Sequence, residues 1–281
     1  MGTIHPSAII SPKAILEDNV TVGPFCVIEE GVHVQAGTTL EYHVILKSGT
    51  TLGKNNYVYP QAILGGGAQH IKLSDKRGSL RIGDNNTIRE NVTIHLGLGE
   101  NDKTVIGDNN LFMVGAHIGH DSIIGSHCIF VNNTMIAGHV KVEDHAYIAG
   151  GAGIHQFCRV GQHAMVGAMA KLVQDAPPYV MIDGVTNKIV GLNLVGLRRK
   201  GFTRDELTDL KSAYRIIYRK NLRWEEIIET LKREFPEGPV TEMVKFLSGG
   251  NRGFLRERRP QNQSLKVTPR PSHDTPLRKV G

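Results

Sequence analysis

Apolar residues, nearly all of them aliphatic, recur at every sixth position through most of the first two thirds of the chain. The series covers residues 4–64, returns in the same phase over 82–94, and continues over 106–172. Large apolar residues fill about a third of an average chain, so a series of this length does not arise by chance. A six-residue period is typical of a solenoid of short strands and turns. Three units are expected per coil, with parallel strands pairing between coils about 4.8 Å apart.

The position four residues after each aliphatic is predicted to hold a second, smaller inward side chain. Cys26, Cys128 and Cys158 all fall at this position, after Val22, Ile124 and Ile154. We therefore expect three buried thiols that act neither as disulfide partners nor as nucleophiles.

Two segments, 65–81 and 95–105, interrupt the repeat without changing its phase. Loops that leave a solenoid in this way often carry function. The repeat ends at Pro177 and Pro178, which cannot continue a pairing strand. These features predict a mainly β solenoid domain over residues 1–190.

From residue 191 the apolar spacing becomes helical. Thr203 and Glu206 form a predicted capping box at the start of one helix, and two further helices fit residues 223–235 and 240–249. We expect a small α-helical domain over 191–256. The polar, proline-containing residues 257–281 are expected to form a basic, disordered tail.

Charge and hydropathy narrow the possible partners. The formal net charge is +6, and residues 252–281 supply all of it, so the body of the chain is near neutral and a general nucleic-acid surface is disfavoured. No apolar run approaches the roughly 20 residues that cross a bilayer. The first residues resemble neither a signal peptide nor a lipid anchor. We expect a cytoplasmic protein with no nucleic-acid partner and no membrane span.

Stacked coils bring polar residues of successive repeats together, because residues about 18 apart lie one above another. One corner is predicted to gather a polar column of His120, Asp121, Gly138, His139, His155 and Gln156. Such a column suits a zinc site, a general base with an orienting carboxylate, or a binding cleft. The carboxylate beside His120 favours the base, and Gly138 offers an N–H to an oxyanion. The column lacks Ser and Cys, which favours direct attack by a substrate group.

The motifs "AHIGHD", "AGHV", "IHQFC", "DAPPYV" and "GLNLVGLRRKGF" closely resemble the UDP-N-acetylglucosamine O-acyltransferases that begin lipid A synthesis, over residues 1 to about 256. The resemblance implies a homotrimer of left-handed parallel β-helices with active sites between subunits. It implies transfer of an (R)-3-hydroxyacyl group from acyl carrier protein to the glucosamine 3-hydroxyl of UDP-N-acetylglucosamine. Neither a metal nor a cofactor is implied.

The same resemblance assigns roles to single residues. His120 is implied as the general base, Asp121 as its orienting group and Gly138 as the oxyanion donor. Ala168 lies where the family selects acyl length, and its small side chain implies a groove for a medium or long chain. His117 and His139 are implied to hold the sugar, and Gln69 and Lys72 to position the sugar and the phosphates. His155 and Gln156 are implied contacts to the nucleotide or the acyl group, and Asn193 and Arg199 are implied to meet the UDP end.

The basic residues near Arg199 offer a surface for the acidic carrier protein or, alternatively, a solvated helix face. They include Arg198, Lys200, Arg215 and Arg219.

Three alternatives remain at this stage. The N-acyltransferase of the same pathway shares the repeat and a catalytic histidine, but usually begins with an additional uridine-binding domain. A trimeric zinc carbonic anhydrase uses the same helix and needs bound metal. The third alternative is a non-catalytic scaffold protein, in which His120 does not act as a base. His70, where some relatives have an acid, leaves the exact sugar contacts open.

Overall fold

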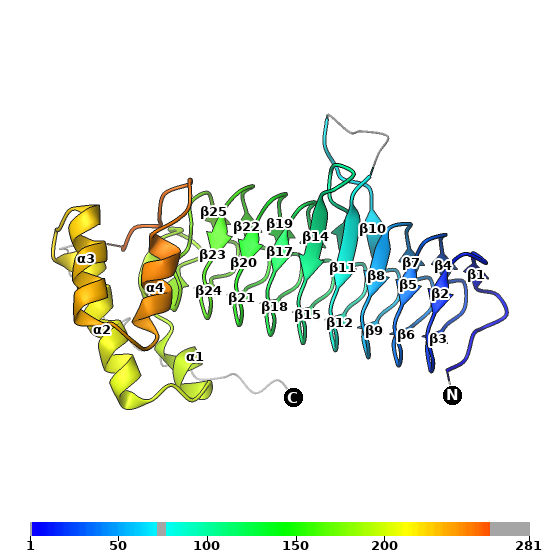
Figure 1. Cartoon of the computed structure of the whole chain (residues 1–281), viewed down its shortest axis with the longest axis horizontal. Helices are drawn as coiled ribbons and strands as arrows, with labels where there is room; N and C mark the ends of the chain where they lie inside the picture. Colours follow the sequence, from blue (N-terminus) through cyan, green and yellow to red (C-terminus); the bar gives the residue numbers. More distant parts are fainter. Residues whose placement is uncertain (1, 72–76, 259–281) are drawn as a thin grey trace, which may run out of the picture.

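Each six-residue unit folds as a short strand followed by a turn, and successive coils stack into a left-handed parallel β-helix (Figure 1). The computed structural model describes residues 2–71 and 77–258. Strands on the three sides of the coil form three sheets. In the coils around His117 the register is regular: His117 pairs with Met135, and Met135 pairs with Gly153. The expected mainly β solenoid is thus confirmed.

All pairings in the three sheets are parallel except that of β26 with β27, which is antiparallel. The first sheet contains β1 (Ile9–Ile10), β4 (Val27–Ile28), β7 (Ile45–Leu46), β10 (Ile63–Gly66), β13 (Thr93–His95), β16 (His117–Ile118), β19 (Met135–Ile136), β22 (Gly153–Ile154) and β25 (Lys171–Leu172). The second contains β2 (Ile15–Leu16), β5 (His33–Val34), β8 (Thr50–Leu52), β11 (Ser79–Ile82), β14 (Lys103–Ile106), β17 (Ile123–Ile124), β20 (Lys141–Val142) and β23 (Arg159–Val160). The third contains β3 (Thr21–Val22), β6 (Thr39–Leu40), β9 (Tyr57–Val58), β12 (Thr87–Ile88), β15 (Leu111–Phe112), β18 (Ile129–Phe130), β21 (Tyr147–Ile148), β24 (Met165–Val166), β26 (Val180–Ile182) and β27 (Ile189–Leu192).

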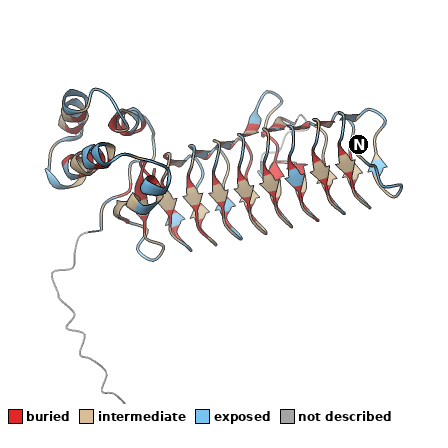
Figure 2. Ribbon diagram, turned by 90° about the horizontal axis from the view of Figure 1, so that it is seen from below, coloured by how far each residue is buried: buried red, intermediate tan, exposed pale blue. Residues whose placement is uncertain are grey.

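The periodic aliphatic residues fill the inside of the coils, which Figure 2 colours as buried. Phe112 and Phe130 stack in adjacent coils with ring centroids 4.9 Å apart. The three cysteines are buried and free, as predicted. Three periodic residues at the start of the chain are exceptions. Ile4 has 57% of its surface exposed, and Ile10 and Leu16 are half-buried, because each lies at the end of its sheet among the described residues and is covered on one side only.

Residues in the left-handed backbone region turn the chain at the corners of the coil. They include Asp121 at φ 60° and His139 at φ 59°, three residues after the inward Ile118 and Ile136. Asn, Asp and His adopt this conformation more readily than most other residues, and His also occupies it at positions 43, 127, 145 and 163. The corner geometry therefore fixes where these two polar side chains leave the backbone.

Four helices follow the solenoid among the described residues: α1 (Leu194–Arg199), α2 (Arg204–Arg219), α3 (Trp224–Glu234) and α4 (Val240–Leu247). The predicted capping box opens α2, where the Glu206 N–H donates to Thr203 Oγ1 and the Thr203 N–H donates to Glu206 Oε2. The helices pack around their own apolar core. In α2, Ile216 is buried and Ile217 is half-buried, because α2 packs on both the solenoid and its neighbouring helices.

After α4 the chain returns to the solenoid. Phe254 forms an isolated β-bridge with Asp175, and Glu257 forms one with Ile189. None of the described helices combines the length and apolar composition needed to cross a membrane. Residues 259–281, most of the expected tail, and residues 72–76 of the first interruption lie outside the described residues.

Candidate active site

A groove of about 700 Å³ runs across successive coils beside the first interruption. Its lining combines imidazoles and other polar side chains with apolar residues. The polar lining comprises Gln69, His70, His95, His117, His120, His155, Gln156 and Lys171, and the apolar lining includes Met135, Gly138, Gly153, Ile154, Met169 and Ala170.

His120 and Asp121 form the shortest polar contact in this groove. His120 Nδ1 lies 2.6 Å from Asp121 Oδ2. Both side chains are largely buried, with 11% and 8% of their surface exposed. The Leu98 N–H, from the second interruption, lies 3.2 Å from each Asp121 carboxylate oxygen. The carboxylate is thus fixed between a backbone donor and the imidazole, which it holds with Nδ1 protonated and Nε2 free to accept a proton.

Gly138 lies against the other edge of the His120 ring. A Cβ built on Gly138 would come within 2.6 Å of His120 Nε2, so only glycine leaves room for the ring in this position. Among the described residues, none accepts a hydrogen bond from the Gly138 N–H. The groove therefore places a free base nitrogen and a free N–H donor next to each other.

His139 completes this corner one coil further on. Its ring stacks on Phe157 with centroids 4.6 Å apart, and its Nε2 lies 3.7 Å from Asp121 Oδ2. The proximity of His120, Asp121 and His139 is compatible with a metal site. Two ligands of one tetrahedral zinc ion are, however, about 3.3 Å apart, so the 2.6 Å between His120 Nδ1 and Asp121 Oδ2 is the geometry of a hydrogen bond.

A second imidazole pair lies beside the first. His95 and His117 meet edge to face with centroids 4.9 Å apart, and His117 Nδ1 lies 2.8 Å from Thr93 Oγ1. Burial lowers the pKa of His95 to about 4, and the nearby His117 and His120 contribute to the lowering. Burial also lowers the pKa of His117. Both imidazoles are neutral near pH 7, so they offer hydrogen bonds rather than charge.

The groove brings together most of the residues that the sequence analysis singled out: Gln69, His117, His120, Gly138, His155 and Gln156. His139 lies behind His120 and Asp121. His155 is exposed and its Nδ1 lies 3.0 Å from Arg252 Nη2. Lys72 lies outside the described residues.

Three further candidates lie away from the groove lining and from the His120–Asp121 corner of a single chain. Asn193 caps α1, where its Oδ1 accepts from the Gly196 N–H and its Nδ2 donates to the His163 carbonyl. Arg199 is exposed in the last turn of α1, and Ala168 is exposed next to the groove residue Met169.

Several parts of the groove could not be identified from the sequence. His95 occupies the first position of the second interruption. The break in the repeat indicated that this segment leaves the solenoid, but it did not identify His95 as part of the site. The Leu98 N–H is a backbone group, which no side-chain pattern reveals. Met135 and Met169 each lie next to an inward residue and were indistinguishable from other outward positions.

Two family models match the chain. One is described as UDP-N-acetylglucosamine O-acyltransferase, domain 2, and matches residues 175–255. The other, bacterial transferase hexapeptide (six repeats), matches residues 103–138. The first spans the end of the solenoid and the helical domain, and the second spans the coils that carry His117 and His120.

Known proteins match almost the whole described chain. An acyl-(acyl-carrier-protein) UDP-N-acetylglucosamine O-acyltransferase of Burkholderia orbicola is 47% identical over 262 residues, covering 91% of this chain and 100% of the relative. The structure of a UDP-N-acetylglucosamine acyltransferase from Bacteroides fragilis is similar with a TM-score of 0.88 at 35% identity, covering 90% of this chain and 100% of that one. The Francisella novicida enzyme gives 0.88 at 37% identity, covering 91% and 94%.

Proposed function

The chain belongs to the UDP-N-acetylglucosamine O-acyltransferase family, and from this premise we propose that His120 is the general base of its reaction. The reaction transfers a 3-hydroxyacyl group from acyl carrier protein to the glucosamine 3-hydroxyl of UDP-N-acetylglucosamine, the first step of lipid A synthesis. The observation that carries the proposal is the buried contact between His120 Nδ1 and Asp121 Oδ2 at 2.6 Å.

The first chemical step follows from this contact. With Nδ1–H donated to Asp121, His120 Nε2 accepts the proton of the sugar 3-hydroxyl as its oxygen attacks the thioester carbonyl carbon. Asp121 stabilises the imidazolium that forms and keeps the ring in its working orientation. No residue of the chain is acylated, since the substrate hydroxyl is itself the nucleophile.

The second step needs an oxyanion donor and an acid. As the C–O bond forms, the carbonyl oxygen becomes negative, and the free N–H of Gly138, which packs against the His120 ring, donates to it. Collapse of the intermediate breaks the C–S bond, and the protonated His120 returns its proton to the leaving thiolate. The products are the 3-O-acyl sugar nucleotide and the free carrier thiol.

The remaining candidate residues are proposed to position the two substrates. The neutral His117 and the corner residue His139 hold the sugar. Gln69 and Lys72 position the sugar and its phosphates, and His155 and Gln156 contact the nucleotide or the incoming acyl group. The apolar part of the groove, with Met135 and Met169, receives the acyl chain, and Ala168 beside it limits the chain length.

A homotrimer is proposed to complete the site. Asn193 and Arg199 are on the helical end of the chain and outside the groove of their own protomer. A neighbouring protomer would bring such residues to the nucleotide end, where Arg199 suits a diphosphate. Arg198 and Lys200, which flank Arg199, together with Arg215 and Arg219, are proposed to receive the acidic carrier protein. We place the reaction in the cytoplasm, where that carrier is found.

Replacement of His120 tests the mechanism. The His120→Ala variant is expected to lose at least 10²-fold in acyl transfer, since general-base catalysis contributes about 10²–10⁴-fold, while keeping its assembly state. The matched control is His127→Ala, an exposed histidine at another corner that stacks on His145. Wild-type activity in His120→Ala would contradict the proposal.

The bond formed in the product distinguishes the O-acyltransferase reaction from that of the N-acyltransferase. An ester is cleaved by mild alkali, whereas the amide made by an N-acyltransferase survives it. A carbonic anhydrase would hydrate CO₂ in proportion to bound zinc, which a metal assay of the active fraction measures.

A further inference from the structure

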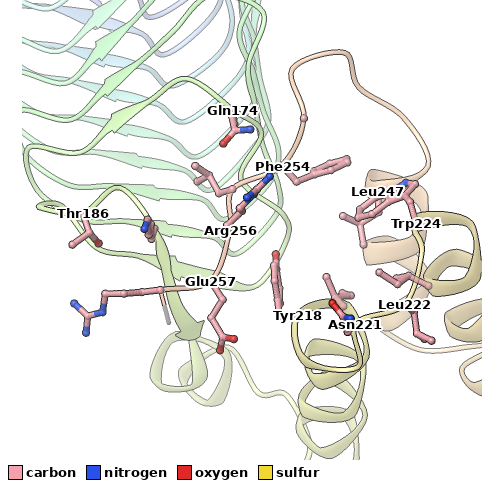
Figure 3. A pocket seen from close by; sticks show the side chains of 16 residues that line it. Gln174, Thr186, Tyr218, Asn221, Leu222, Trp224, Leu247, Phe254, Arg256 and Glu257 are labelled. Atoms are coloured by element: carbon pink, nitrogen blue, oxygen red, sulfur yellow. The ribbon is translucent and has the colours of Figure 1, made fainter. Parts of the chain in front are cut away.

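A second cavity, of about 1320 Å³, lies between the end of the solenoid and the helical domain. Figure 3 shows Gln174 and Thr186 on the solenoid side, Leu222, Trp224 and Leu247 on the helical side, and Phe254 and Arg256 on the returning segment between them. No residue lines both this crevice and the acyl-transfer groove. The crevice is therefore a separate feature of the fold.

One wall of the crevice is apolar and aromatic. Trp224 and Phe254 stack with ring centroids 4.9 Å apart and an interplanar angle of 16°. Leu222, Ile227 and Leu247 extend this wall. Trp224 retains 36% of its surface exposed, so the wall presents an aromatic face that the protein does not cover. Such a surface favours a hydrocarbon chain.

The other wall carries unpaired positive charge. Among the described residues, none accepts a hydrogen bond or ion pair from the Arg256 guanidinium or the Lys188 ammonium, and both side chains are exposed. The acidic residue of this lining, Glu257, is already bound by the Tyr214 hydroxyl at 2.9 Å and by Arg219 at 2.8 Å. The net charge facing the crevice is therefore positive.

A neutral donor lies in the wall between these two parts. The Tyr218 hydroxyl is buried without a hydrogen-bond partner among the described residues, and Figure 3 shows the side chain reaching from α2 toward the segment that carries Arg256. Burial raises the pKa of Tyr218, so the phenol stays protonated and can only donate to an anion at neutral pH. An orphaned buried hydroxyl is costly and marks a place where a polar group is accommodated.

We propose that this crevice binds an amphipathic anion, a single hydrocarbon chain with a phosphate or carboxylate headgroup. The chain lies against Trp224 and Phe254, and Arg256 and Lys188 bind the headgroup. Ligand sites combine an apolar lining with a few polar groups in this way, and guanidinium is well suited to either headgroup. The proposal does not depend on the acyl-transfer mechanism.

The sequence provides a selective probe, because Trp224 is the only tryptophan of the chain. Its fluorescence is titrated in the full-length protein with decyl phosphate and with decanoate, below their micelle concentrations. A saturable spectral shift is expected. Decanol, which lacks the charge, and inorganic phosphate, which lacks the chain, are each expected to bind at least tenfold more weakly. The tighter of the two anions identifies the headgroup. Absence of a saturable shift, or equal binding of decanol, would overturn the proposal.

Substitutions of Arg256 and Lys188 test whether these two residues bind the headgroup. Arg256→Gln and Lys188→Gln are each expected to weaken binding about tenfold, the loss of one charge-assisted hydrogen bond. Arg233→Gln, an exposed arginine of α3 outside the crevice, is the matched control and should bind as the wild type does. Unchanged affinity in both crevice variants would refute the site. Truncation after Arg258 should leave the affinity unchanged, and a tenfold rise would instead assign the crevice to the chain's own tail.

Discussion

Gly138 and the His120 ring are packed so closely that a single methyl group would separate them. A Cβ on Gly138 would lie 2.6 Å from Nε2 and 2.7 Å from Cε1 of His120, distances that real Cβ contacts do not reach. The backbone of one coil is therefore shaped to the imidazole of the coil before it. Gly138 therefore has two proposed roles. Its N–H donates to the oxyanion, and its lack of a side chain leaves the room that the His120 ring occupies.

Replacement of Gly138 by alanine is expected to lower kcat by about 10²–10³-fold, the usual cost of losing an oxyanion donor or its geometry. The methyl group displaces the ring, and the N–H donor no longer faces the reacting carbonyl. Steady-state kinetics with acyl carrier protein and UDP-N-acetylglucosamine measure the loss. Gly67→Ala is the control, because a Cβ there meets no atom within 4 Å. Equal activity of the two variants would argue against the proposed role of Gly138.

Asp121→Asn is expected to preserve the fold and lower kcat by about 10²–10⁴-fold. An amide retains the size of the carboxylate but no longer stabilises the imidazolium, and it can hold His120 in the wrong tautomer. KM for the sugar nucleotide should change little, because the loss arises in the transition state. A rise in KM with unchanged kcat would instead show that Asp121 binds substrate.

The sequence predicts the parts of the site that follow from the six-residue repeat, but not the groups in its interruptions or at its end. The inward residues Ile118 and Ile136 fix the coil, so the stacking of Gly138 on His120 follows from spacing alone. The Leu98 N–H that binds Asp121 belongs to a non-repeating loop, whose backbone path no periodicity encodes. The capping role of Asn193 likewise depends on where the solenoid ends and the first helix begins.

The buried His95 predicts how stability responds to acid. Its pKa is lowered from 6.5 to about 4, so the unfolded chain binds a proton that the folded chain rejects. The stability associated with neutral His95 is present above pH 6.5 and is lost progressively as the pH falls toward 4. At pH 5 the loss from this group is about 2 kcal/mol.

His95→Gln is therefore expected to lose about 2 kcal/mol less stability than the wild type between pH 7.5 and pH 5. Urea unfolding at both pH values and one protein concentration measures the difference. His5→Gln replaces an exposed histidine in the first coil and serves as the control. If His95→Gln and wild type lose the same stability, protonation of His95 is not linked to folding.

A buried ion pair is predicted to hold the helical domain on the solenoid. Arg159 Nε donates to Asp175 Oδ2 at 2.8 Å, and Arg159 Nη2 donates to the carbonyl oxygens of Phe246 and Gly249. The Asp175 side chain is 1% exposed. Arg159→Met leaves this carboxylate without its cation, which is expected to cost about 3–5 kcal/mol.

The unfolding of Arg159→Met can be followed through Trp224, which stacks on Phe254 beside the same contact. Lys13→Met removes an exposed pair with Glu30 and should leave the unfolding midpoint unchanged. The double variant Arg159→Met with Asp175→Leu removes both charges and should recover part of the loss, because apolar groups tolerate burial where a lone carboxylate does not. If the double variant is less stable than Arg159→Met alone, then the contacts of Arg159 with α4, rather than its charge, hold the two domains together.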